Sequence, residues 1–145
     1  MRQRKKIEIP LKLVELENEN YHILVEIRFS DDEPQMLVID TGASKTVLDI
    51  NLTKYYSEVH TPLTEIESMG IGDLKIETKS GAIKELKLGD VTLHDLNVAL
   101  IDLSQLNILY HQFTNQKISG LIGSDFLVRY KANIDFKKLV LILTV

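Results

Sequence analysis

The sequence predicts an all-β fold, either a barrel or a sandwich, with two or three short helices. Most of its apolar segments are short, and they either alternate with polar residues or form brief continuous runs, as strands do. Turn-forming residues separate these segments at short intervals. No linker and no internal repeat divides the chain, so we expect a single domain over residues 1–145.

Three strands are expected in the first forty residues. Segments 7–16 and 21–29 alternate apolar and polar residues with period two. Pro10 indicates an edge or a strand start, because proline has no N–H to donate to a ladder. Residues 30–34 have the composition of a turn, and the fully apolar run 36–39 predicts a buried strand.

The middle of the chain predicts further strands and one short helix. A brief strand at 46–48 is followed by Asp49, which we expect to cap a helix that runs to about Tyr56. Gly89-Asp90 predicts a tight hairpin turn. Strand segments are then expected at 63–66, 74–76, 83–88, 91–93 and 96–101.

Helical spacing is clearest over 104–113, where the apolar residues are Leu106, Leu109, Tyr110 and Phe113. We expect Ser104, or the segment 102–104 as a whole, to cap this helix. A second short helix is predicted at 125–130. Segments 132–136 and 139–144 predict a closing hairpin.

The composition defines the class of protein. Of the 145 residues, 44% are hydrophobic and 26% are charged, a globular balance that excludes whole-chain disorder, collagen and coiled coil. There is no cysteine, which excludes a disulfide framework, a thiolate zinc site and a cysteine nucleophile. The net charge of −4 argues against a general nucleic-acid binder.

Residues 1–6 form a basic start that we expect to be a solvated, flexible terminus. No uninterrupted apolar stretch follows them, as a signal peptide would require, and no run approaches the ~18 apolar residues of a membrane span. We therefore expect no membrane span and a cytoplasmic location, although a disulfide-free exported protein would have a similar composition.

The candidate site begins with Asp40, which directly follows four apolar residues and so places a charge at the edge of the core. Thr41 offers a hydroxyl that can fix a loop, and Gly42 allows a sharp turn and a close backbone approach. These are the parts of a rigid loop that presents a carboxylate. An ordinary turn after a strand would use the same residue types.

A second motif decides between these interpretations. Segment 37–44, apolar residues leading into Asp-Thr-Gly-Ala, and segment 121–127, two apolar residues, a glycine and a short helix, resemble the retropepsin-like aspartic proteases, the single-lobe relatives of pepsin. The resemblance covers roughly residues 20–144, and the ending 132–136 looks closest to bacterial members. It implies a closed β-barrel of the acid protease fold.

In that family a glycine-bearing hairpin, the flap, closes over the substrate. The resemblance implies that Met69, Gly70, Ile71 and Gly72 form this flap and, with Ala43, contact the substrate. Ser80-Gly81 is the alternative flap tip, and a plain surface hairpin is the alternative role. The segment 104–117 is longer than in the viral enzymes and could line the site or cover the barrel. The core-type spacing of its apolar residues favours covering the barrel.

The family hydrolyses peptide bonds with two aspartates that share one proton, and it needs no metal, cofactor or covalent intermediate. This sequence has one Asp-Thr-Gly and the length of one lobe. The resemblance therefore implies a homodimer in which two copies of Asp40 meet on the two-fold axis. Thr41 would bond the partner's loop and Gly42 would allow the close approach, so that Asp40, Thr41 and Gly42 form the catalytic loop.

Ala43 stands where the pepsins usually have a hydroxyl that holds the catalytic carboxylate. Alanine cannot donate such a bond, so we expect activity at mildly acidic rather than strongly acidic pH.

Other chemistries have weaker signals. The sequence lacks a Gly-x-Ser-x-Gly elbow, and Gly70-Ile71-Gly72 lacks the third glycine of a dinucleotide fingerprint. Asp125 and Asp135 are expected to be structural. No histidine has a partner at metal-ligand spacing, so surface or partly packed positions are expected for His22, His60, His94 and His111.

Three functions remain open on the sequence. The first is a homodimeric aspartic endopeptidase that acts on a peptide or protein. The second is a catalytically silent member of the same fold that dimerises or binds peptides, because a fold can outlast its activity. The third is a subunit whose second aspartate comes from a different chain.

Overall fold

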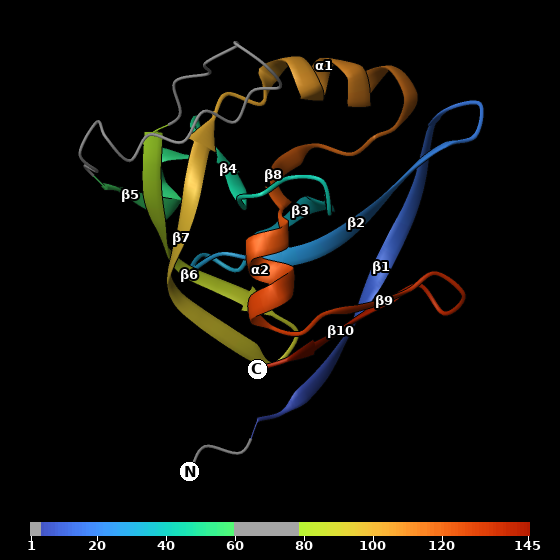
Figure 1. Ribbon diagram of the computed structural model, residues 1–145. Helices are drawn as coiled ribbons and strands as arrows, with labels where there is room; N and C mark the ends of the chain where they lie inside the picture. Colours follow the sequence, from blue (N-terminus) through green and yellow to red (C-terminus); the bar gives the residue numbers. More distant parts are fainter. Residues whose placement is uncertain (1–3, 60–78) are drawn as a thin grey trace.

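The computed structural model describes residues 4–59 and 79–145, and strands dominate this part of the chain, as predicted (Figure 1). The strands are β1 (Lys6–Glu17), β2 (Asn20–Arg28), β3 (Pro34–Ile39), β4 (Val47–Asp49), β5 (Tyr56–Val59), β6 (Lys79–Leu88), β7 (Val91–Ile101), β8 (Ile118–Ile122), β9 (Asn133–Asp135) and β10 (Val140–Thr144). The helices are α1 (Ser104–Phe113), α2 (Ser124–Arg129) and the single 3₁₀ turn η1 (Thr53–Tyr55).

Six strands close into a ring. Their order is β6-β7-β4-β8-β3-β2, and the additional pair Arg28↔Lys87 joins β2 back to β6. β1, β10 and β9 continue the sheet beyond β2, and β5 flanks β6. The predicted closed barrel is therefore present, because ring closure leaves these six strands with partners on both sides.

β1 belongs to both parts of the sheet. Its first half pairs with β10 as far as Pro10↔Val140, and its second half pairs with β2 from Leu11↔Val25 onward. Leu11 donates its N–H toward β10, to the Leu139 carbonyl. Successive N–H groups alternate sides, so the Pro10 nitrogen faces the β2 side before pairing there has begun. Pro10 thus lies inside the strand, at the change of partner, where its missing N–H costs no hydrogen bond.

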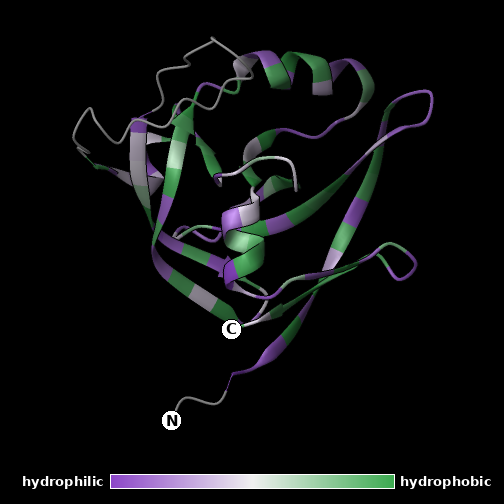
Figure 2. Ribbon diagram, in the orientation of Figure 1, coloured by the Kyte–Doolittle hydropathy of each residue, from purple (hydrophilic) through white to green (hydrophobic). Residues whose placement is uncertain are grey.

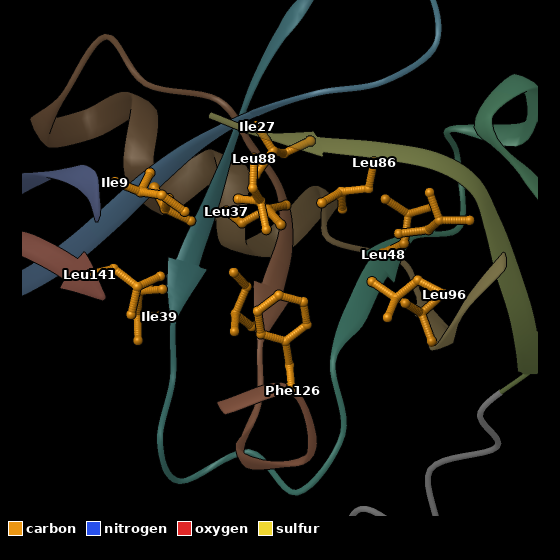
Figure 3. Close-up of a cluster of buried hydrophobic side chains, with 14 of the residues drawn as sticks. Ile9, Ile27, Leu37, Ile39, Leu48, Leu86, Leu88, Leu96, Phe126 and Leu141 are labelled. Carbon is orange, nitrogen blue, oxygen red and sulfur yellow. The ribbon is translucent and has the colours of Figure 1, made fainter. Parts of the chain in front are cut away.

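The main core fills the barrel. Alternate residues of the strands point inward, and Figure 2 shows hydrophobic and hydrophilic residues alternating along β1. Phe126 of α2 packs into the same cluster (Figure 3). A second cluster lies outside the barrel, where α1 covers the outer face of the sheet as expected for this segment. α1 matches the predicted range 104–113.

Polar contacts fix α1 to the barrel at two points. The hydroxyl of fully buried Tyr110 bonds Nδ1 of His22 on β2 at 2.6 Å. The amide of Asn107 bonds the backbone of Ile118 in both directions, at 2.7 and 2.9 Å. His22 is therefore a packed histidine, as the sequence predicts. Ser104 is the first helical residue and not the N-cap, which is Leu103 and makes no side-chain capping bond. Asp102, one residue earlier, accepts the Ser104 N–H at 3.0 Å and the Ser104 hydroxyl at 2.6 Å.

Some elements differ from the prediction. Asp49 caps no helix, because it ends β4 and its buried carboxylate accepts N–H groups of Asn51 and Leu103. The helix expected from Asp49 to Tyr56 is only η1. The strands expected at 91–93 and 96–101 are one strand, β7, with a kink at Asp95, whose φ is 54°. The segments 63–66 and 74–76 lie outside the described residues.

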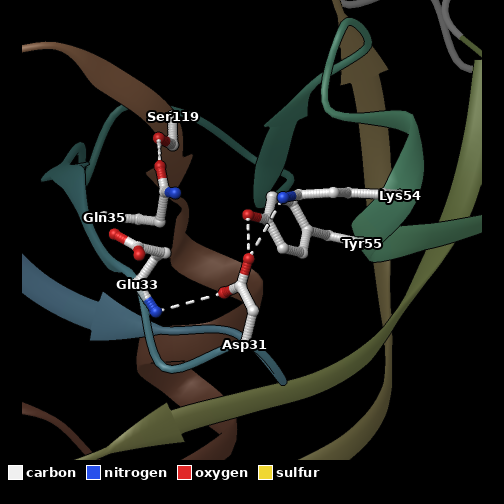
Figure 4. Close-up of polar contacts among 6 residues, drawn as sticks. All are labelled: Asp31, Glu33, Gln35, Lys54, Tyr55 and Ser119. Atoms are coloured by element: carbon white, nitrogen blue, oxygen red, sulfur yellow. Dashed lines mark hydrogen bonds and ion pairs between the residues drawn. The ribbon is translucent and has the colours of Figure 1, made fainter.

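A polar network closes the end of the barrel formed by the β2–β3 turn. Asp31 accepts the Tyr55 hydroxyl at 2.5 Å and faces the Lys54 ammonium at 3.2 Å (Figure 4). The Tyr55 hydrogen bond is the main cause that lowers the pKa of Asp31. Asp32 of the same turn contacts Lys87 of β6 at 2.6 Å. The Asp32 contact joins the β2–β3 turn to β6 next to the pair that closes the ring, and the Asp31 contacts join the turn to η1.

The described part of the chain contains no helix long and apolar enough to cross a membrane.

We expect Tyr110→Phe to lower the free energy of unfolding at about pH 7 by about 1 kcal/mol, because it removes the bond to His22. Burial raises the pKa of Tyr110 from 10.0 to about 12, so the folded protein keeps a proton that the unfolded chain releases. The wild type therefore loses stability as pH rises from 10 toward 12, and the variant lacks this loss.

Urea unfolding of both proteins from about pH 9 to about pH 11 measures this difference. The gap in stability should narrow as pH rises. Tyr21→Phe is the control, because Tyr21 is half-exposed, and it should match the wild type throughout. A difference in stability between the wild type and Tyr110→Phe that stays constant across this pH range would contradict the raised pKa of Tyr110 in the folded protein.

Candidate active site

Asp40 lies at the end of the buried strand β3. Leu37, Val38 and Ile39 are all buried, whereas Asp40 is partly exposed. The Asp40 N–H donates to the Ile122 carbonyl of β8 at 2.9 Å. The buried strand thus fixes the backbone from which the Asp40 carboxylate emerges into solvent, as the sequence predicts for a carboxylate at the edge of the core.

The segment 40–46 joins two strands that lie on either side of β8. β3 pairs with β8 in parallel, with Ile39 opposite Ile122, and β4 pairs with β8 antiparallel, with Val47 opposite Leu121. The connection must therefore pass over the end of β8. This crossing brings the two sequence motifs together, the Asp-Thr-Gly loop and the apolar pair that ends in Gly123.

Backbone hydrogen bonds hold the loop in this position. Within the loop, the Gly42 N–H donates to Asp40 Oδ1 and the Ala43 N–H donates to the Asp40 carbonyl, each at 3.1 Å. Across the crossing, the Ser124 N–H donates to the Ala43 carbonyl at 2.7 Å. The orientation of the Asp40 carboxylate is thus tied to its own loop, and the loop is tied to the start of α2.

Gly123 is required by this crossing. A Cβ at this position would lie 2.6 Å from the backbone of Lys45 and 2.9 Å from the Ala43 carbonyl oxygen. Both atoms belong to backbone, which cannot rotate away as a side chain can. Gly42 differs, because a Cβ there would make only an ordinary 3.4 Å contact with Asp40 Oδ1. The predicted reason for Gly42, the approach of a partner loop, stays a prediction.

A buried hydroxyl links the loop to α2. Thr46 is 2% exposed; its Oγ1 donates to Asp125 Oδ1 at 2.8 Å and accepts the Gly123 N–H at 3.2 Å. Asp125 Oδ1 also accepts the Phe126 N–H at 2.8 Å. The expectation that Asp125 is structural fits these contacts. No local pattern in the sequence marks Thr46, because its partner Asp125 lies 79 positions away.

The other predicted site residues fall in two groups. Thr41 and Ala43 lie on the same loop as Asp40, with Thr41 exposed and Ala43 partly buried. Met69, Gly70, Ile71 and Gly72, predicted to form the flap, lie outside the described residues, in the connection between β5 and β6, and His60 lies there too. The alternative tip, Ser80-Gly81, is wrong. Both residues sit inside β6 and pair with β5 and β7.

One carboxylate on a fixed loop can accept or donate a proton. Acid and base roles in the same step need two groups whose protonation states differ. In the part of the chain that the structure describes, no three His, Cys, Asp or Glu side chains gather as metal ligands would. The Asp40 loop thus offers one partly exposed carboxylate for such chemistry.

Two sequence comparisons show which known proteins this chain resembles. A family model described as aspartyl protease matches residues 25–126, a range that contains both the Asp40 loop and Gly123. A sequence search of curated proteins found no match.

Similar solved structures include the following two. A retropepsin-like aspartic protease from Rickettsia conorii is 19% identical, with a TM-score of 0.50, and the match covers 98% of this chain and 92% of that one. The crystal structure of edgp is 13% identical, with a TM-score of 0.62, and the match covers 97% of this chain and 46% of that one. This chain thus spans about half the length of edgp. What these structures share with the chain is the fold.

We expect Thr46→Val to lower the free energy of unfolding by about 2 to 3 kcal/mol, because it leaves the Gly123 N–H without its partner and removes a donor to Asp125. Thr46→Ser keeps the hydroxyl and should cost about 1 kcal/mol for the lost methyl group. Urea unfolding compares the two variants. Equal losses would show that the hydroxyl contributes nothing.

Proposed function

The chain belongs to the aspartyl protease family and has the retropepsin-like fold, and from this premise we propose that it is an aspartic endopeptidase that acts as a homodimer. The observation that carries the proposal is the Asp40 loop. It presents a single carboxylate, which the crossing over β8 fixes from behind and which is open to solvent in front. Such a loop supplies half of a catalytic carboxylate pair.

In the proposed mechanism the two Asp40 carboxylates of a dimer share one proton, because like charges about 3 Å apart cannot both ionise. The ionised Asp40 takes a proton from a water molecule, which attacks the carbonyl carbon of the scissile peptide bond. The protonated Asp40 donates to the developing oxyanion. Proton transfer to the leaving nitrogen then completes cleavage, and no covalent intermediate forms.

The open edge of β9 supports a symmetric dimer. α2 begins directly after Gly123 and leads to β9, which ends the strand order, so that its outer edge is unpaired among the described residues. An unpaired edge can hydrogen-bond the same edge of a second copy. Val128 on α2 is 77% exposed and Phe136 after β9 is 66% exposed. Two apolar side chains beside an open edge are typical of a protein contact.

The homodimer predicts a subunit-mixing effect. Asp40→Asn removes the shared proton and the base, so we expect peptide cleavage to fall by roughly a thousandfold or more. Adding an equal amount of Asp40→Asn protein to the wild type, well above the dimer dissociation constant, should lower activity to about half, because half of the wild-type subunits enter mixed dimers.

Cleavage of a quenched fluorescent peptide library, measured against protein concentration, provides the assay. Activity per subunit should rise with concentration as dimers form. A rate of cleavage that does not change when the Asp40→Asn protein is added would show that one copy contains a complete site. A dimer that cleaves nothing from about pH 3 to about pH 7 would instead favour the silent peptide-binding module.

The absence of a hydroxyl at position 43 predicts a shift in the pH profile. In Ala43→Ser the added hydroxyl can donate to the ionised Asp40 and favour that form, so we expect the pH optimum of kcat/KM to move to lower pH. Ala43→Cys is the control of similar size, because a thiol is a weak donor. Identical profiles for the two variants would contradict the role given to this position.

A further inference from the structure

Exposed apolar side chains gather on α1 and on the β1–β2 hairpin. Of the eight exposed large hydrophobic residues in the described part of the chain, these two elements carry five: Leu13, Tyr21, Ile108, Leu109 and Phe113. On α1, Leu109 and Phe113 are four residues apart and so lie side by side on one face of the helix. Leu109 and Phe113 are therefore neighbouring exposed apolar side chains, and such surface is typical of an interaction site.

A groove of about 510 Å³ lies between the end of α1 and the hairpin. It is lined by Glu15, Leu16, Glu17, Asn18 and Phe113, and we call it the α1 groove. Leu16 is 1% exposed and forms an apolar floor, whereas Phe113 is 43% exposed and forms a wall. The β1–β2 register shifts between Glu15 and Glu17, at the stretch of β1 that lines the groove.

The charge of the α1 groove has one sign. Its lining contains the acidic residues Glu15 and Glu17 and no basic residue. Both are exposed, and neither forms an ion pair within the described residues. Glu19 at the hairpin tip donates its N–H to Glu15 Oε1 at 3.3 Å and so adds a third negative charge close to Glu15. An apolar floor with an acidic rim complements a ligand that carries positive charge beside a large apolar group.

We propose that the α1 groove binds a cationic amphipathic segment of a protein partner. A large apolar side chain of that segment packs on Leu16 and against Phe113, and flanking Lys or Arg residues pair with Glu15 and Glu17. Nucleic acid and anionic membranes carry negative charge, which these carboxylates repel. None of the lining residues belongs to the Asp40 loop or to α2, so this binding does not depend on the proposed cleavage chemistry.

The test uses the full chain with Asp40→Asn, so that the probe stays intact. The probe is a fluorescein-labelled peptide with one Phe and one Leu between four Lys residues, and fluorescence anisotropy measures its binding. We expect saturable binding that weakens as salt is raised, because the charged pairs are exposed. A peptide with Glu in place of Lys, and one with Ala in place of Phe and Leu, should not bind.

Two variants locate the probe in the groove. Phe113→Ser should weaken binding at least fivefold, whereas Val59→Ser, which removes another exposed apolar side chain on β5 outside the groove, should leave it unchanged. The double charge reversal Glu15→Lys with Glu17→Lys should abolish binding, and Glu58→Lys with Glu85→Lys on β5 and β6 is its control. No saturable binding, or equal effects of variants and controls, would overturn the proposal. Peptide cleavage by the wild type is measured in a separate assay. A negative result in the binding assay therefore does not affect the test of the proposed cleavage, and a negative cleavage assay does not affect the binding test.

Discussion

The close contact between the backbone of Gly123 and the backbone of residues 43–45 is the constraint on which the site depends. Because β3 and β4 pair with opposite sides of β8, their connection has to cross the end of that strand. The crossing is possible only where no Cβ stands in the way, and Gly123 provides that space. A chain that crosses itself at van der Waals distance has little freedom, so Asp40 is held by the backbone geometry of the barrel.

The polar contacts follow from the same crossing. Backbone groups that are brought together in a buried place must be satisfied, since an unpaired N–H there costs more than a hydrogen bond gains. The Thr46 hydroxyl accepts the Gly123 N–H and donates in turn to the Asp125 carboxylate. Among the described residues, Thr41 and Gly42 at the front of the loop are exposed. A loop that is fixed on one face and exposed on the other can meet the same loop of a second copy, and for this reason we propose that the chemistry belongs to a dimer.

The proposed catalytic surface and the α1 groove use different properties of one small barrel. The first depends on buried backbone, where a displacement of the loop would move a reacting carboxylate. The second depends on exposed side chains that extend from α1 and the β1–β2 hairpin, where geometry is less restricted. α1 covers the outer face of the sheet through its buried Tyr110 and Asn107 and leaves Leu109 and Phe113 outside. Covering the barrel therefore uses only one face of this helix.

The sequence alone determined the features that depend on neighbours in the chain. Period-two alternation gave β1 and β2, helical spacing gave α1 at 104–113, and the apolar run before Asp40 placed the carboxylate at the end of a buried strand. Local patterns also produced the errors: Asp49 has the composition of a helix cap, and only tertiary structure shows that it ends β4 and binds Leu103. The tertiary structure alone decided that Pro10 lies at a change of partner, that Thr46 supports the loop, and that Gly123 meets Lys45. These features depend on contacts between residues far apart in the chain, and no local pattern records which distant segments the barrel brings together.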